Sequence, residues 1–121
     1  MNYKFTYLVE EDLWRLEENI KVKLSNNEWI TIPIGLKTDG RSSPKFLRNI
    51  LPQFNRQILA FLIHDYLYIS NYKWNELGTR KAQKFADDEM LFWELKLGMG
   101  KFEAYSCYWA VKLFGRSVYL Q

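Results

Sequence analysis

The first forty residues alternate between apolar and polar positions at the spacing of β-strands. Residues 3–9 are rich in aromatic and branched side chains, and residues 19–24 place three branched aliphatic side chains on one face. A polar stretch at residues 25–28 separates this segment from another alternating one at residues 29–34. Two alternating segments joined by a short polar turn predict a β-hairpin.

The rest of the chain carries apolar residues at helical spacing. Residues 55–69, Thr79–Lys96 and 102–113 each repeat apolar positions at intervals of three and four, which predicts three helices. Asn55 and Thr79 are expected as their N-caps. Strands followed by helices predict an α+β fold, with a small N-terminal antiparallel β-sheet followed by about three packed helices.

Loops are predicted where glycine, proline and polar residues gather. Residues 35–44 form the first loop, after which residues 44–50 are expected to form one or two helical turns. Residues 70–78 are expected to be a second loop. The length fits a single domain over residues 1–121, with a β part at 1–35 and a helical part at 44–115.

The composition excludes several classes of protein. Hydrophobic residues make up 48% of the chain, and its one cysteine cannot form an intramolecular disulfide. The charged N-terminal residues do not resemble a signal peptide, and no apolar run reaches the roughly 20 residues that span a bilayer. The net charge is only +3, and no zinc cluster, P-loop or dinucleotide fingerprint occurs.

Aromatic side chains recur along the predicted last helix. Four large apolar side chains share one helical stripe there: Phe102, Tyr105, Trp109 and Leu113. Such a stripe is expected in the core. Because arginine and lysine do not interleave densely with the aromatic residues, nucleic-acid binding is disfavoured.

Two polar residues, His64 and Asp65, stand inside the otherwise apolar run Ile58–Ile69. A helix that is apolar all round is expected at the centre of the core, where an unpaired polar group costs a few kcal/mol. The pair must therefore meet partners or line a cavity. A histidine held by a carboxylate suits a general base, and an aspartate can bind a hard cation. A buried network that only holds the fold together is the alternative.

The helix Thr79–Lys96 offers a partner for His64. If it packs antiparallel to the first helix, Asp87 reaches the imidazole from across the interface, and Glu94 lies on the same side of the helix as Asp87. Its other acidic residues, Asp88 and Glu89, are expected to face solvent.

The loop at residues 38–44 offers further groups. Its carboxylate, glycine and hydroxyls can give oxygen ligands to a cation, or N–H groups to an anion. The alternative is a tight turn that binds nothing.

The order of these motifs resembles a small phage and prophage family of unknown function. The matching pieces are Thr38-Asp39-Gly40, Pro44, His64-Asp65, Leu67-Tyr68, Ala86-Asp87, Ala110-Val111 and Phe114-Gly115. Arg41-Ser42 and Glu94 depart from the residues usual in that family. The resemblance implies a phage or prophage origin, hence the cytoplasm of an infected bacterial host or the virion, and brings no established activity.

The sequence His-Asp-x-x-Tyr is also similar to the catalytic helix of secreted calcium-dependent phospholipases. That similarity implies His64 as the base, Asp65 as a metal ligand and Asp87 as the residue that orients His64. The Asp39 loop would complete the metal site. Those enzymes rely on disulfides that this chain lacks, so only the geometry is carried over.

These observations lead to one candidate site and two functional hypotheses. The site has His64 and Asp87 as catalytic residues, Asp65 and Asp39 as metal ligands, and a lining of Gly40, Ser43, Tyr68 and Glu94. The first hypothesis is a small hydrolase that uses a divalent cation such as calcium on a small substrate. The second is a phage accessory or virion protein that binds a phage or host protein through an exposed patch near Trp74 or Tyr119.

Overall fold

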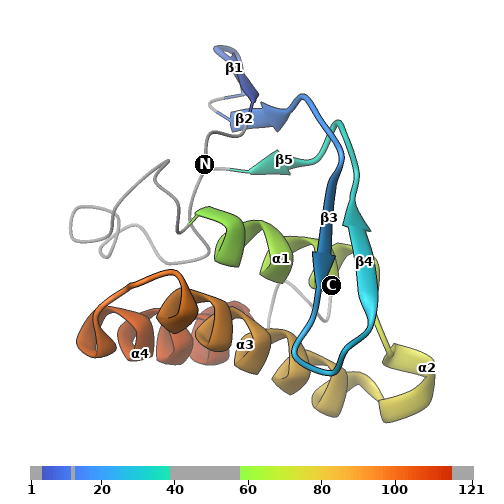
Figure 1. Ribbon diagram of the computed structural model, residues 1–121, viewed down its shortest axis with the longest axis vertical. Coiled ribbons are helices and arrows are strands. Elements are labelled where there is room, and N and C mark those ends of the chain that lie inside the picture. The colour runs from blue at the N-terminus through green and yellow to red at the C-terminus, as the bar shows by residue number, and fades with distance from the viewer. Residues whose placement is uncertain (1–3, 12, 39–57, 116–121) are drawn as a thin grey trace.

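The computed structural model describes residues 4–11, 13–38 and 58–115, with the strands first and the helices after them (Figure 1). The predicted α+β fold is confirmed. The elements are β1 (Phe5–Leu8), β2 (Leu13–Leu16), β3 (Ile20–Lys23), β4 (Trp29–Ile32), β5 (Lys37–Thr38), α1 (Ile58–Ile69), α2 (Trp74–Leu77), α3 (Thr79–Lys96), α4 (Lys101–Ala110) and the π-helical turn η2 (Val111–Gly115). No helix in the described ranges is both long and apolar enough to cross a bilayer.

The strands form two small antiparallel sheets rather than the single sheet predicted. The predicted hairpin is confirmed as β3 and β4, with Val22 opposite Ile30. The other sheet has the order β1-β2-β5. Its two-residue strand β5 lies inside the predicted loop at 35–44, because it is too short to show an alternating pattern and pairs only with Trp14 and Arg15 of β2.

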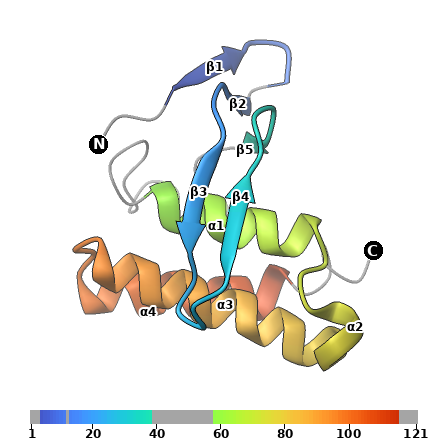
Figure 2. The same ribbon diagram turned by 45° about the vertical axis from the view of Figure 1, so that its right-hand side comes forward.

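The hairpin lies across the helices (Figure 2). Its inward side chains, which include Ile20, Val22 and Ile32, join Leu62 and Ile63 of α1 in one buried cluster. The alternating pattern of β3 and β4 is therefore the pattern of strands that bury one face against a helix.

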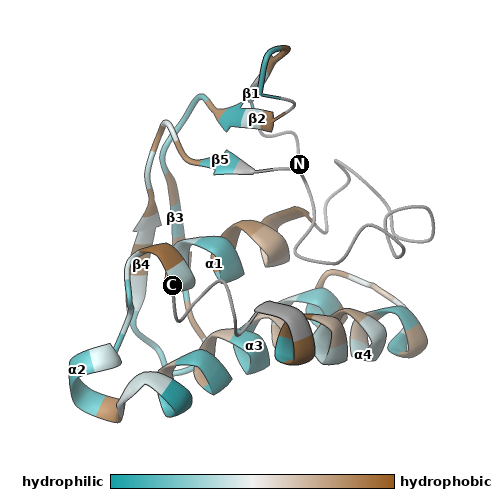
Figure 3. Ribbon diagram, turned by 180° about the vertical axis from the view of Figure 1, so that it is seen from behind, coloured by the Kyte–Doolittle hydropathy of each residue, from teal (hydrophilic) through white to brown (hydrophobic). Residues whose placement is uncertain are grey.

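Helix α1 runs antiparallel to α3, and α4 packs beside α3 (Figures 1 and 3). The three predicted helices are confirmed, although the predicted start at Asn55 and the turns at residues 44–50 lie outside the described residues. The predicted cap at Thr79 is wrong, because Gly78 is the N-cap and the Thr79 hydroxyl accepts a hydrogen bond from the Trp74 indole. That tryptophan belongs to α2, a single helical turn inside the predicted loop at 70–78.

The orientation of α4 differs from the prediction. Its predicted core stripe is exposed, with exposed fractions between 47% at Tyr105 and 83% at Phe102. The opposite face, which includes Ala104 and Cys107, packs instead against Phe61 of α1 and the α3 residues of the same cluster. Small side chains on that face allow the helices to approach closely, which fixes α4 with its large side chains outward.

One acidic residue of α3 was predicted in solvent but lies in the core. The Glu89 carboxylate, 1% exposed, accepts hydrogen bonds from the backbone N–H and the hydroxyl of Ser25, both at 2.6 Å. Both of its oxygens are therefore satisfied, which makes its burial tolerable. Its neighbour Asp88 is half-buried and pairs with Lys84 at 2.6 Å.

Candidate functional site

The side chains of His64 and Asp87 meet in the interface between α1 and α3. The His64 Nε2 atom lies 2.8 Å from Asp87 Oδ1, and the two residues are 3% and 2% exposed. The antiparallel packing of the two helices produces this contact, so the predicted reach of Asp87 to His64 is confirmed. The catalytic roles assigned to the two residues stay predictions.

Tyr68 completes the contact from one turn further along α1. Its hydroxyl donates a hydrogen bond of 2.7 Å to the same oxygen of Asp87, and its ring centroid lies 4.2 Å from that of His64. Residues four apart share one face of a helix, which places His64 and Tyr68 on the side that faces α3. One oxygen of Asp87 thus ties α3 to two successive turns of α1.

Asp65 lies on the other side of the imidazole. Its Oδ1 atom is 4.0 Å from His64 Nδ1, which is close enough for charge attraction but longer than a hydrogen bond. The Nδ1 atom is buried and has no hydrogen-bond partner among the described residues. His64 therefore stands between two carboxylates.

Burial and the two carboxylates together set the protonation state of His64. Burial by itself would lower the pKa of the imidazole, but the carboxylates of Asp65 and Asp87 outweigh burial and raise the pKa from 6.5 to about 9. His64 is therefore an imidazolium at neutral pH, and its charge is balanced by the aspartates on both sides.

Glu94, predicted to line the site, is fully buried two turns further along α3. Neither of its carboxyl oxygens has a hydrogen-bond partner among the described residues. Burial raises the pKa of Glu94 to about 8, although Cys107 and His64 act to lower it. Burial also raises the pKa of the Cys107 thiol far above its usual range. At neutral pH both groups are uncharged.

A cavity borders the His64–Asp87 pair on the side of Asp87. That residue lines this cavity of about 190 Å³, whose other lining residues are Arg80, Gln83, Lys84 and Lys112. The sequence interpretation missed these four residues. Three of them, Arg80, Gln83 and Lys84, share a face of α3 with Asp87, because they precede it at helical intervals of three and four residues. This spacing is visible in the sequence and could have indicated that they lie beside Asp87.

The predicted metal ligands are only partly described. Asp65 stands beside His64, whereas Asp39, Gly40 and Ser43 lie outside the described residues. Within residues 4–11, 13–38 and 58–115, no group of three or more histidine, cysteine, aspartate or glutamate side chains is arranged to hold a metal ion.

Comparison with known proteins gives one family. No curated protein and no solved structure matches the chain. A family model described as a protein of unknown function, DUF1353, matches residues 14–111, which include most of β2, the hairpin, and all of α1, α3 and α4. The match covers His64 and Asp87 and most of the chain. The chain therefore belongs to the DUF1353 family of proteins of unknown function.

Proposed function

We propose that the protein acts by binding another protein through the exposed apolar side of α4. This surface, the α4 face, consists of Phe102, Tyr105 and Trp109 of α4 together with Leu113 of η2. The single observation that carries the proposal is the exposure of these four side chains, which is close to half or more for each of them.

The α4 face has the properties of a protein-binding surface. Its side chains follow one another at intervals of three and four residues, so they form one continuous stripe along the helix. Aromatic side chains bury 150–250 Å² each, so the stripe exposes on the order of 500 Å² of largely apolar surface. Monomeric proteins seldom expose apolar patches larger than a few hundred Å², and tyrosine and tryptophan are frequent at the centres of interfaces.

In this proposal the His64–Asp87 pair is structural. The pair is buried, it joins α1 to α3, and its imidazole is protonated at neutral pH. A protonated imidazole has no lone pair with which to accept a proton, so it does not serve as a general base at that pH. The buried pair therefore fixes how two helices pack, while binding takes place on a third.

The class of partner, and the place where it is bound, are inferred from the resemblance of the motifs. The resemblance to phage and prophage proteins supports a phage or host protein as the partner, in an infected bacterium or in the virion. Trp74 of the predicted patch is partly exposed on α2, outside the α4 face, and Tyr119 lies outside the described residues.

Site-specific photo-crosslinking tests the α4 face. A photoreactive residue at position 105 of the full chain, in living cells, is expected to give one discrete adduct with a different polypeptide. The same residue at the exposed position 81 of α3 is the matched control and is expected to give none. Phe102→Gln, a change at an 83% exposed side chain, should reduce the adduct at position 105 without lowering the melting temperature. Equal adducts at both positions, or an adduct with a second copy only, would overturn the proposal.

Hydrolysis is the second candidate function, because Asp87 lines the cavity of about 190 Å³ together with three basic residues, and this cavity is called the basic cavity below. In that case Asp87 orients His64, Arg80 and Lys84 attract an anionic substrate, and Asp65 and Asp39 hold a divalent cation such as calcium. Since the pKa of His64 is about 9, only about one imidazole in a hundred is neutral at pH 7. A rate that depends on His64 as the base is therefore expected to rise about tenfold for each pH unit up to pH 9.

Rate measurements on ester and phosphoester substrates check this candidate. Turnover should require His64, so His64→Gln is expected to lose at least 100-fold in rate, whereas Asp88→Asn on the neighbouring surface should keep the rate. Both variants are first compared by circular dichroism, because a folded but inactive His64→Gln protein is the informative result. If no substrate turns over at pH 9 with calcium or manganese present, hydrolysis by this pair is rejected.

A further inference from the structure

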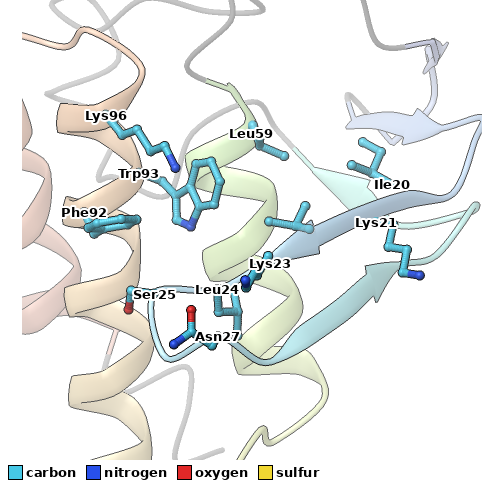
Figure 4. A pocket seen from close by; sticks show the side chains of 11 residues that line it. Ile20, Lys21, Lys23, Leu24, Ser25, Asn27, Leu59, Phe92, Trp93 and Lys96 are labelled. Carbon is cyan, nitrogen blue, oxygen red and sulfur yellow. The ribbon is translucent and has the colours of Figure 1, made fainter.

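We infer that the outer edge of β3 binds an extended, acidic peptide segment of a partner protein, which pairs with β3 as an added strand. This site is distinct from the α4 face, since none of the four residues of that face lines it. It is an open cavity of about 490 Å³ between β3 and α3 (Figure 4). A volume of this size lies within the range of binding clefts in proteins.

The cavity follows the edge of the strand. All of residues 20–25 line it, although their side chains alternate between the two faces of the hairpin. A cavity lined from both faces of a strand lies along the strand's edge, where the backbone is accessible. In the part of the chain that the structure describes, β4 is the only strand paired with β3.

The phase of the hairpin directs backbone groups toward this edge. Leu24 donates its N–H to the Glu28 carbonyl, which makes Leu24 and Glu28 a hydrogen-bonded pair. Hydrogen-bonded and non-hydrogen-bonded pairs alternate along an antiparallel ladder, so Val22 with Ile30 is the next hydrogen-bonded pair. The N–H and C=O groups of Lys21 and Lys23 therefore point away from β4. These groups form no hydrogen bond with the described part of the chain, and free edge groups are the template on which an extended peptide adds as a strand.

The far wall of the cavity supplies apolar contacts. Phe92 and Trp93 of α3 and Leu59 of α1 line it (Figure 4). The Nε1–H group of Trp93 is buried and has no hydrogen-bond partner among the described residues. An apolar side chain of an added strand would pack against these rings.

The charge around the cavity selects the composition of the peptide. Three lysines line it, namely Lys21, Lys23 and Lys96, and none of the lining residues within the described ranges is acidic. None of the three forms an ion pair with a described residue, and Lys96 Nζ stands 4.8 Å from the centroid of the Trp93 ring. Lysines close to a strand edge attract glutamate or aspartate side chains of an added strand. A segment with alternating acidic and apolar residues fits both the lysines and the apolar wall.

Peptide binding to the full chain tests the inference. The probe is a fluorescent eight-residue peptide in which glutamate alternates with leucine or phenylalanine, and binding is followed by fluorescence anisotropy. Saturable binding is expected for this peptide. A peptide with lysine in place of glutamate should bind at least tenfold more weakly. A third peptide, N-methylated at alternate residues, keeps the side chains but loses the N–H groups of one edge, and it should also bind at least tenfold more weakly.

Matched variants locate the site. The double change Lys23→Gln and Lys96→Gln removes two lysines of the cavity and is expected to weaken binding at least tenfold. The double change Lys81→Gln and Lys101→Gln removes the same charge at exposed positions outside the cavity, and affinity should change less than twofold. All four substitutions are at exposed lysines, so the fold is expected to be kept.

Three results would overturn the inference. The first is equal binding of the N-methylated peptide, which would exclude strand addition. The second is displacement of the peptide by decanoate at equal concentration, because decanoate has an apolar chain and a carboxylate but no amide groups. The third is a dimer of the protein alone that the double change Lys23→Gln and Lys96→Gln dissociates, which would assign the edge to a second copy. Loss of the crosslink at position 105 would leave this inference intact, because the two surfaces share no residue.

Discussion

Asp87→Ala is expected to lower the free energy of unfolding by about 3–5 kcal/mol, the usual cost of removing one partner of a buried ion pair. The change leaves the buried imidazolium of His64 without its 2.8 Å partner and removes the 2.7 Å hydrogen bond that Tyr68 donates to Asp87. Urea denaturation at pH 7 measures the effect. Asp87→Asn is expected to lose less, because its amide oxygen still accepts a hydrogen bond from Tyr68.

The neighbouring residue provides the control for this prediction. Asp88 forms an exposed ion pair with Lys84, and pairs of that kind contribute about 0–1 kcal/mol. It also accepts a hydrogen bond of 2.9 Å from the Tyr108 hydroxyl, which contributes about 1 kcal/mol. Asp88→Ala removes the same charge from the same helix, so it is expected to cost much less than Asp87→Ala. Equal losses for the two variants would mean that the buried pair does not hold α1 against α3.

The second large effect is a loss of stability at alkaline pH. The folded protein keeps a proton on His64 up to pH 9, whereas the unfolded chain releases it near pH 6.5. The folded state therefore binds more protons between these values, so stability falls as the pH rises. The difference between the pKa of 6.5 in the unfolded chain and about 9 in the folded protein corresponds to about 3 kcal/mol of stability. This contribution is fully present below pH 6.5 and is lost by pH 9.

Glu94 acts in the same direction. Burial raises its pKa from 4.5 to about 8, so the folded state again holds a proton that the unfolded chain releases. Urea titrations at intervals from pH 5 to pH 9 should therefore show stability decreasing throughout. Glu94→Gln should remove the decrease in stability below pH 6, and the loss of stability due to His64 between pH 6.5 and 9 should remain. A stability that is constant or rises over that interval would contradict the proposed charge state of His64.

The sequence predicts those parts of the fold in which the pattern of apolar residues leaves only one face that can be buried. The hairpin has a single apolar face, and α3 has a single stripe of small and apolar residues beside Asp87. Their packing, and with it the contact of Asp87 with His64, follows from periodicity. Helix α4 has two apolar faces, one small and one large, so periodicity cannot decide which of them is buried.

Other features depend on contacts between residues far apart in the chain. Glu89 is buried because Ser25, sixty-four residues earlier, satisfies both of its oxygens, and no local pattern records such a pairing. The raised pKa values of His64 and Glu94 likewise require the packed interface. The residues of the basic cavity share a visible spacing, but only the packing of η2 against α3 adds Lys112 to them.

The burial of Cys107 has a practical consequence for spectroscopy. Its thiol is fully enclosed and stays protonated far above neutral pH, so maleimide and iodoacetamide reagents lack the thiolate they require. A cysteine introduced on the surface therefore becomes the single reactive thiol in the native protein. Spin labels or fluorophores can then be attached at the β3 edge or along α4 in the otherwise natural chain, and distances between the hairpin and the helices followed as partners are added.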